Sequence, residues 1–329
     1  MNNSDNPEYN LQIWSVFLAK VVFSDESWWN ILLASILIII FIVGLIGNLL
    51  TCVVIYSDKT MHTATNFYLF NMAVSDTVVS FGIFLEIYVF LNDMYIFSNV
   101  TCKLHFFFVI VLWNNSILVM TALAIERYIA IWHPLLLKSA PAWKRVMKVI
   151  CFIWIIAICE TAPEILTVEL IKTPSITVCY TVPSPLARII NGILALVTFI
   201  IPLGIMLFVY TMIALKVSVS EKSNSEKKIF NHKDNRRKVN KLVAITLSFL
   251  ICWLPFFTFR LLFFFFDMRG LMQLEKMWGI GYRVILVNSW LCIVLNPILF
   301  SLMSTKFRQA LKILWITKIK KKEHPQISV

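Results

Sequence analysis

Long apolar stretches separated by short polar ones dominate the chain. Each of the apolar stretches is long enough to cross about 30 Å of hydrocarbon as a helix rising 1.5 Å per residue. There are seven of them, at approximately 29–56, 65–91, 103–132, 142–168, 186–217, 239–266 and 278–303. The pattern predicts an all-α membrane protein with three parts: an N-terminal tail over 1–28, a seven-transmembrane helix bundle over 29–303, and an amphipathic helix with a tail over 304–329.

The two ends of the chain carry weaker patterns. The first 19 residues contain no Lys or Arg, so the N-terminus does not resemble a cleavable signal peptide. Residues 11–23 fit either an amphipathic helix on the membrane surface or a disordered tail, and the sequence leaves both open. Residues 304–316 place Phe307 and Leu311 on one helical face and Lys306 on another, which predicts a short eighth helix at the membrane surface.

Composition indicates the class of protein, and the distribution of charge indicates its orientation in the membrane. The 329 residues are 59% hydrophobic and 15% charged, with a mean hydropathy of +0.79, which is typical of membrane proteins. If the tail lies outside, 21 of the 30 Lys and Arg residues lie on the inner side and 8 on the outer side. The positive-inside rule therefore predicts an extracellular N-terminus in the plasma membrane. The net charge of +12 then faces anionic lipid and does not indicate a nucleic-acid partner.

Two cysteines stand apart from the other five, which fall within the apolar stretches. Cys102 begins the third stretch and Cys179 lies in the loop between the fourth and fifth, both on the oxidising side. We expect them to form a disulfide. Asn2 and Asn99 begin glycosylation sequons on the same side.

A series of short motifs, each at a corresponding depth, carries a resemblance to a known family. They are Gly47-Asn48, Asn71-Met-Ala-Val-Ser-Asp76, Cys102, Glu126-Arg127-Tyr128, Trp154, Pro202, Tyr210, Cys252-Trp253-Leu254-Pro255 and Asn296-Pro297-Ile298-Leu299-Phe300. Each motif alone is a weak signal. In this order they resemble a rhodopsin-like G-protein-coupled receptor from about residue 44 to 307. Such a protein is a receptor and not an enzyme.

The resemblance implies roles for particular residues. The acid and arginine of Glu126-Arg127-Tyr128 would pair at rest, and the arginine would meet the G protein on activation. The remaining switch residues implied are Trp253, Ile117, Pro202, Phe249, Asn296, Pro297, Phe300 and Tyr210. Family members usually have tyrosine where Phe300 stands, and the missing hydroxyl should weaken the active state.

A buried carboxylate in the second stretch is the one candidate for an ion. Asp76 lies mid-membrane, where an isolated charge is costly. The family pattern implies an allosteric sodium ion held by Asp76, Ser116 and Asn296. Cys292 stands at another common sodium-site position, where asparagine is usual, so a water-filled polar network without tight sodium is the alternative. No other cofactor is predicted.

Two positions narrow the ligand class. An amine receptor would carry aspartate where Val109 stands, and an opsin would carry lysine where Trp290 stands. A peptide is the remaining class. Residues 85–88, 252–260 and 296–307 resemble the neuromedin U, pyrokinin and CAPA receptor group, whose peptides end in an amidated arginine-containing sequence. Ghrelin and thyrotropin-releasing-hormone receptors share parts of these stretches.

The predicted peptide site has an acidic and a basic member. Glu86 is expected to pair with the peptide's arginine, and Arg260 to hold its amide carbonyl or to balance Glu86. Phe256, Phe257 and Phe259 would supply apolar walls. Glu86 stands one residue nearer Asp76 than the corresponding glutamate in this receptor group, and the proline that usually precedes it is missing. The sequence therefore leaves open whether the Glu86 side chain points toward the pocket.

The sequence leaves alternatives open for the acidic residues and for the function. In the first, Glu86 and Arg260 form an internal ion pair that never touches the ligand. Glu160 and Glu164, about one turn apart, would extend an acidic pocket or sit at a helix interface or rim. A membrane transporter or channel, or a decoy receptor that signals weakly, would use the same bundle. The resemblance implies a heterotrimeric G protein, Gq and calcium release.

Overall fold

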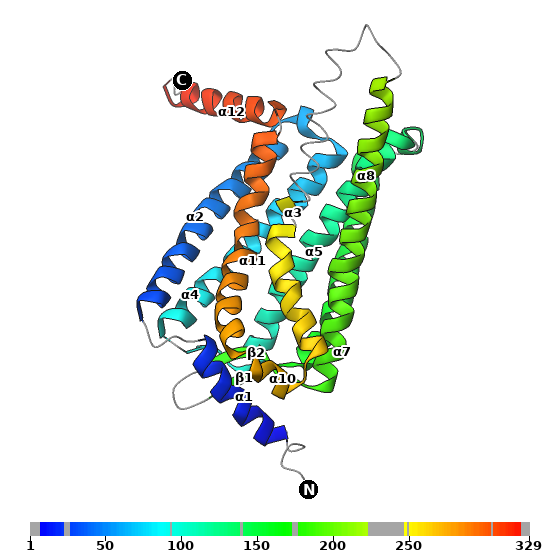
Figure 1. Cartoon of the computed structure of the whole chain (residues 1–329). Coiled ribbons are helices and arrows are strands. Elements are labelled where there is room, and N and C mark those ends of the chain that lie inside the picture. Colours follow the sequence, from blue (N-terminus) through cyan, green and yellow to red (C-terminus); the bar gives the residue numbers. More distant parts are fainter. Residues whose placement is uncertain are drawn as a thin grey trace.

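The computed structural model is an elongated bundle of helices that run side by side along most of its length (Figure 1). It describes residues 7–22, 27–92, 94–138, 141–172, 177–222, 247–248, 250–303 and 305–323. Two of the predicted site residues, Asn2 and Phe249, lie outside these ranges. Phe300 lies in a helix, but its side chain is not among those described.

The helices of the bundle follow the seven apolar stretches. They are α2 (Ser27–Ser57), α3 (Ala64–Ser80) with α4 (Gly82–Asn92), α5 (Asn99–Trp132), α6 (Ala142–Thr161) with the 3₁₀ segment η4 (Ala162–Leu166), α7 (Pro185–Leu194) with the π-helical segment η5 (Ala195–Ile200) and α8 (Ile201–Lys222), the helix Leu250–Phe265, and α11 (Glu275–Met303). Within the described residues, six are long and apolar enough to cross a membrane, and Leu250–Phe265 is a shorter apolar helix. The predicted seven-helix bundle is confirmed.

The third membrane helix, α5, forms the centre of the bundle. In its most apolar stretch 61% of residues are buried, against 28–39% in the other five long helices. It packs against α3, α6 and α8, so its side chains reach most of the interior. A residue on α5 is therefore placed to contact several helices at once.

The second membrane helix is broken in the middle. It ends as α3 at Ser80 and resumes as α4 at Gly82. The Ser80 hydroxyl donates to the Thr77 carbonyl oxygen at 2.7 Å. A Cβ added to Gly82 would lie 3.2 Å from the ring of Trp290, so glycine permits α11 to approach closely here.

A two-stranded hairpin crosses one end of the bundle, which we call the hairpin end. β1 (Val168–Lys172) pairs antiparallel with β2 (Thr177–Thr181). Cys179 of β2 forms a disulfide with Cys102 at a Cα–Cα distance of 5.6 Å, as predicted. The sequence pattern missed these strands: the fourth apolar stretch was expected to stay helical to 168, but Val168 begins β1.

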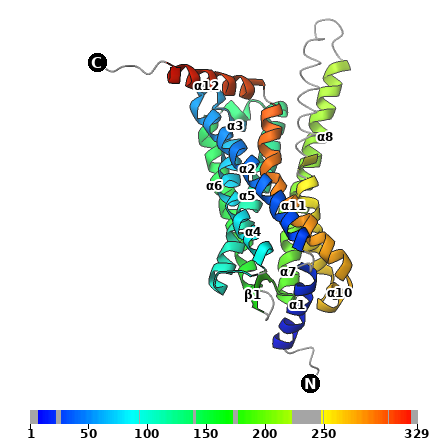
Figure 2. The same ribbon diagram turned by 90° about the vertical axis from the view of Figure 1, so that its left-hand side faces the viewer.

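An N-terminal helix, α1 (Pro7–Val22), lies at the hairpin end outside the strands. It packs against α11 and β1, close to the short helix α10 (Met268–Gln273) (Figure 2). The helical alternative for this segment is therefore correct. Its apolar face, however, covers the protein itself.

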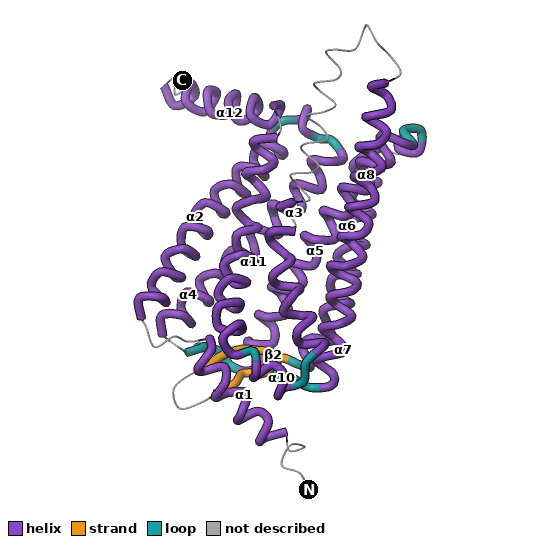
Figure 3. Tube along the Cα trace, in the orientation of Figure 1, coloured by secondary structure: helices purple, strands orange, loops and turns teal. Residues whose placement is uncertain are grey.

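At the opposite end, α12 (Thr305–Glu323) crosses the bundle nearly at right angles (Figures 1 and 2). Phe307 and Ala310 of α12 are buried against Val54 and Met61. The predicted eighth helix is present. We call this end the α12 end. Figure 3 shows that helices account for almost the whole trace and that the strands are confined to the hairpin end.

Candidate functional site

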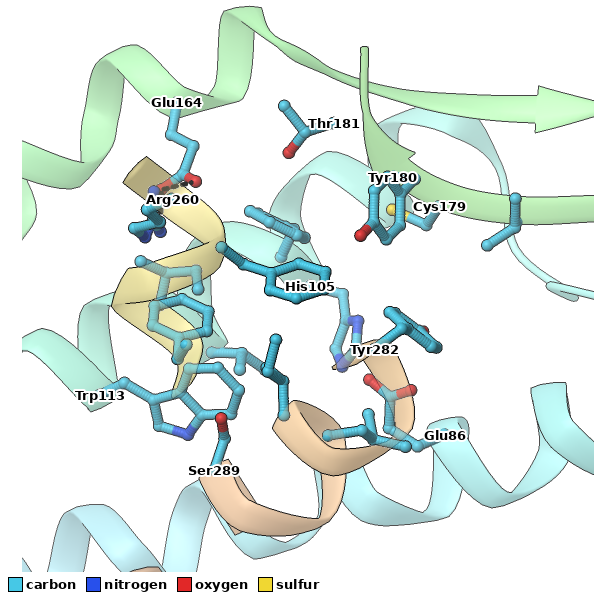
Figure 4. Close-up of a pocket in the computed structure, with 18 of the residues that line it drawn as sticks. Glu86, His105, Trp113, Glu164, Cys179, Tyr180, Thr181, Arg260, Tyr282 and Ser289 are labelled. Atoms are coloured by element: carbon cyan, nitrogen blue, oxygen red, sulfur yellow. Dashed lines mark hydrogen bonds and ion pairs between the residues drawn. The ribbon is translucent and has the colours of Figure 1, made fainter. Parts of the chain in front are cut away.

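A cavity of about 180 Å³ opens inside the hairpin end. Its walls come from α4, α5, β2, the helix Leu250–Phe265 and α11, and Figure 4 shows their side chains converging on one space. Among its lining residues are Glu86, Val109, Phe256, Phe259 and Arg260, all of them predicted from the sequence. Glu86, whose direction the sequence left open, thus faces the cavity.

Glu86 forms the acidic side of this cavity. Its carboxylate lies close to the side chains of His105 and Tyr282 (Figure 4). Burial, together with the charge of Glu86, raises the pKa of the nearby Tyr95 phenol to about 12, so this hydroxyl stays protonated at neutral pH. Among the described residues Glu86 has neither an ion pair nor a hydrogen bond. It is therefore an acidic side chain in the wall without a partner for its carboxyl group.

Arg260 forms the opposite side, and its charge is already balanced. Its Nη1 lies 2.9 Å from Glu164 Oε1, and its Nη2 donates to Glu164 Oε2 at 3.1 Å. Nη1 also donates to Asn191 Oδ1 at 2.9 Å, and the guanidinium lies over the Phe256 ring. The side chains of Arg260 and Glu164 are 6% and 3% exposed. The internal Glu86–Arg260 pair is not formed, and Glu164 lines the cavity instead of an outer rim.

Aromatic rings make up the floor of the cavity. Trp113 packs edge-on against Phe256 at 5.4 Å between centroids, against Trp253 at 5.6 Å and against Trp290 at 5.4 Å. The indole nitrogens of these three tryptophans and the hydroxyl of Ser289 are buried, without a hydrogen-bond partner among the described residues. Buried donors of this kind are costly unless something accepts from them. Trp113 and Ser289 line the cavity and therefore offer donors to a ligand.

One predicted wall residue faces elsewhere. Phe257 is fully buried and stacks on Phe199 of η5 at 4.7 Å, and it is not among the lining residues. Consecutive residues of a helix point about 100° apart. Since Phe256 points into the cavity, Phe257 points toward the fifth membrane helix.

The sequence analysis missed several lining residues, and for two of them a signal was present. His105 and Trp113 stand one turn before and one turn after Val109, so all three share a face of α5. With Val109 in the pocket, helical spacing would have predicted His105 and Trp113 as well. No such inference was available for Tyr282, because no predicted ligand-binding residue lies near it on α11.

The middle of the bundle holds the candidate ion site. Asn296 Nδ2 donates to Asp76 Oδ2 at 2.9 Å, and Ser116 is buried. The oxygens of Asp76 and Ser116 suit a hard cation. Cys292, also buried, would offer a sulfur, which a hard cation binds poorly. The available residues therefore fit sodium with a reduced set of ligands.

The remaining switch residues lie in the core. Ile117 and Trp253 are fully buried in one apolar cluster, against which Tyr210 packs. Pro202 is also buried and lies one residue inside α8. Pro297 lies inside α11, and a Cβ added to Gly47 would come within 2.9 Å of its ring. The roles implied for these residues stay predictions.

At the α12 end, the acid of Glu126-Arg127-Tyr128 has a partner that the sequence did not indicate. Arg145 Nη2 lies 2.5 Å from Glu126 Oε1, and Arg145 Nη1 donates to the Leu137 carbonyl oxygen at 3.0 Å. Arg127 is exposed, while Tyr128 stacks on Trp132. The carboxylate thus joins α5 to α6 and does not hold its neighbouring arginine.

The sequon asparagine Asn99 is engaged in a contact between α5 and the hairpin. Its Nδ2, the atom that would carry a glycan, donates to Glu169 Oε2 at 2.9 Å. Its Oδ1 accepts from the backbone of Leu170 at 2.9 Å. Glycosylation at Asn99 would require this exposed side chain to give up its bond to Glu169.

Comparison with known proteins identifies the family to which this geometry belongs. The model of the 7 transmembrane receptor (rhodopsin family) matches residues 47–300. Mouse neuromedin-U receptor 2 is 32% identical over 83% of the chain and 72% of its own length. The pyrokinin-1 receptor of Drosophila melanogaster is 28% identical over 83% of the chain and 77% of its own, and a neuromedin U receptor homolog of Caenorhabditis elegans is 29% identical over 82% and 76%. The chain therefore belongs to the rhodopsin family of seven-transmembrane receptors.

Proposed function

We propose that this chain is a receptor for an extracellular peptide with an amidated, arginine-containing C-terminal sequence, of the neuromedin U and pyrokinin type. The similar receptors bear those names. The observation that carries the proposal is the contrast within the cavity: Glu86 is an uncompensated acid, whereas Arg260 is bound by Glu164. A positively charged group of a ligand would supply the partner that Glu86 lacks.

Arginine of the peptide suits this acid. A guanidinium binds a carboxylate through two parallel hydrogen bonds, and such a contact is stronger out of water. Glu86 lies among Tyr95, His105 and Tyr282, whose rings limit the water around it. The ion pair would therefore remove the cost of an isolated buried charge as well as orient the peptide.

The amidated end of the peptide would lie on the floor. Arg260 is the less suitable donor, because its Nη1 and Nη2 already bond to Glu164 and Asn191. Trp113 Nε1 and Ser289 Oγ on the floor have no hydrogen-bond partner among the described residues, as is also true of Tyr95 Oη and His105 Nε2 beside Glu86. A neutral carboxamide can accept from them, whereas a carboxylate there would be a second unpaired buried anion beside Glu86.

Peptide and G protein would act at opposite ends. We assign the hairpin end to the extracellular side, since it carries the disulfide and the cavity. The α12 end then faces the cytoplasm, and Arg127 there is exposed for contact with a heterotrimeric G protein. The resemblance favours Gq and calcium release. This orientation places a multi-pass receptor in the plasma membrane with its N-terminus outside.

The test is a panel of amidated peptides on cells that express the chain with a G protein. We expect Glu86→Gln to lower the potency of the arginine-containing agonist about 100-fold, equivalent to roughly 2–3 kcal/mol. Replacing the peptide's arginine by citrulline should lower its potency on the wild-type receptor by a similar factor. On Glu86→Gln the same replacement should lower potency little further, since both changes remove the same contact. Equal potency on both receptors would refute the pairing.

The same assay separates the alternatives. A response to ghrelin-like or thyrotropin-releasing-hormone-like peptides alone would assign a different peptide class. Peptide binding without nucleotide exchange would indicate a weakly signalling decoy, as the missing hydroxyl at Phe300 suggests. Ion or solute flux without binding would indicate a transporter or channel.

A further inference from the structure

The N-terminal helix buries an aromatic side chain in a cradle directly above the cavity. Trp14 is completely buried, and its ring centroid lies 6.0 Å from that of Trp278, 6.1 Å from Phe263 and 6.4 Å from Tyr180. Its Nε1 donates to the Thr181 carbonyl oxygen at 3.1 Å. We call the rings of Tyr180, Phe263 and Trp278 the aromatic cradle.

The aromatic cradle and the cavity share walls. Tyr180 and Phe263 both contact Trp14 and line the cavity, and so does Thr181, which accepts the indole hydrogen bond. Phe17, Leu18 and Val21 of α1 are buried in the same apolar cluster. The cradle is therefore an outward continuation of the pocket, and α1 fills it.

The pocket beneath α1 is too small for the ligand that it is proposed to bind. Its volume is about 180 Å³, whereas sites for ligands of several residues or drug size measure roughly 300–1,000 Å³. The cavity must therefore gain space from a neighbouring part of the protein. Its own lining comes from membrane helices and from a hairpin fixed by the disulfide, whereas the adjoining aromatic cradle is filled by Trp14 of α1.

α1 covers the aromatic cradle with few polar contacts to hold it there. Among the described residues, its polar contacts to the rest of the protein are the Trp14 hydrogen bond and one ion pair, Lys20 Nζ to Glu275 Oε1 at 2.8 Å. That ion pair is 68% and 42% exposed, so solvent screens it. A helix of 16 residues is also marginal on its own once its apolar face is released.

We propose that the aromatic cradle is a second ligand subsite, for an aromatic or bulky aliphatic side chain of the peptide N-terminal to its arginine, and that Trp14 occupies it until the peptide arrives. This inference rests on the proposed peptide function. The peptide's apolar residue replaces Trp14, α1 leaves the cradle, and the pocket gains the volume that Glu86 and the floor need to bind the rest. In the absence of peptide, α1 competes with the ligand.

The experiment measures the association rate of a fluorescent amidated arginine-containing peptide with the full-length receptor. Trp14→Ala should raise this rate about tenfold, because the fraction of receptor with a vacant cradle rises in proportion. Val16→Ala is the matched control, since Val16 lies on the exposed face of the same helix at 64% exposure. An unchanged or slower association for Trp14→Ala would overturn the proposal and make α1 a fixed part of the receptor.

A second set of variants tests the same displacement in case Trp14→Ala fails to fold. Lys20→Glu should raise the association rate roughly twofold to threefold by repulsion from Glu275, and adding Glu275→Lys should restore it. In addition, peptide should increase labelling of a Phe17→Cys receptor by a membrane-impermeant maleimide, since Phe17 is buried while α1 is seated. Labelling that peptide leaves unchanged would contradict displacement.

The peptide's own residues complete the test. Alanine in place of the peptide's bulky apolar residue should slow association with the wild type and have a smaller effect on Trp14→Ala. If the Glu86→Gln loss is observed while Trp14→Ala and the peptide change do nothing, the peptide function stands and the subsite fails. If no arginine-containing peptide binds either receptor, the proposed function itself fails.

Discussion

Two acid–base pairs join the fourth membrane segment to its neighbours, one at each end of the bundle. At the hairpin end Glu164 binds Arg260, with side chains 3% and 6% exposed. At the α12 end Arg145 binds Glu126, with side chains 22% and 10% exposed. The pairs look alike, but their surroundings give them different roles.

The difference lies in what else each charged group can bind. Arg260 is fixed on both sides by Glu164 and Asn191, so the pair holds the pocket wall in one arrangement. Glu126 has Arg127 beside it in the sequence, and we propose that it can exchange Arg145 for Arg127. The hairpin-end pair then holds the shape of the cavity, whereas the α12-end pair would act as a switch. The predictions below break each pair in turn.

The largest effect is expected from the deeper pair. Glu164→Gln leaves the Arg260 guanidinium buried without its counter-charge, which should destabilise the receptor by about 3–5 kcal/mol. Thermal unfolding of the solubilised receptor measures it. The double variant with Arg260→Gln should regain most of the loss, because the stranded charge is removed.

The control for this change is a shallower pair at the same end. Glu169 pairs with Lys103 at 2.7 Å, with 40% and 24% exposure. Glu169→Gln should therefore cost no more than about 1 kcal/mol. Equal losses for Glu164→Gln and Glu169→Gln would mean that burial does not distinguish the two pairs.

An intermediate effect is expected at the α12 end, on signalling. Arg145→Gln frees the Glu126 carboxylate to bind Arg127, and a restrained Arg127 is less available to the G protein. We expect agonist-stimulated nucleotide exchange to fall about fivefold, equivalent to roughly 1 kcal/mol. Lys148→Gln, one turn further along α6 and exposed, should leave exchange unchanged. A rise in exchange for Arg145→Gln would show that Arg145 restrains the receptor.

The smallest effect concerns a third buried carboxylate, between the two pairs. Asp76 accepts from Asn296, and no arginine or lysine pairs with it among the described residues. We propose that sodium supplies the missing charge. Sodium at about five times its dissociation constant should then stabilise the receptor by about 1 kcal/mol relative to choline. Asp76→Asn should abolish this shift in thermal stability, and a shift that persists in the variant would place sodium elsewhere.

Part of the binding site could be expected from the sequence, but its geometry could not. Val109 and Phe256 were expected in the pocket because of the resemblance to a receptor family, and both line the cavity. The direction of Glu86 could not be predicted, because it depends on how α4 is rotated in the packed bundle. Phe257 was expected to line the pocket but faces the fifth membrane helix. The sequence shows that Phe256 and Phe257 are adjacent, but it does not show which of them the rotation of the helix turns toward the pocket.

The sequence by itself determined the membrane helices, the disulfide and the family. Hydrophobic length is a local property, and Cys102 and Cys179 have no competing partners on their side of the membrane. Only the tertiary structure decided which acid binds which base. Arg260 binds Glu164, which is 96 residues away in the sequence, and Glu126 binds Arg145, 19 residues away, instead of the adjacent Arg127. A buried charge takes whichever partner the packed helices bring within hydrogen-bond distance, and that choice is made between helices rather than along the chain.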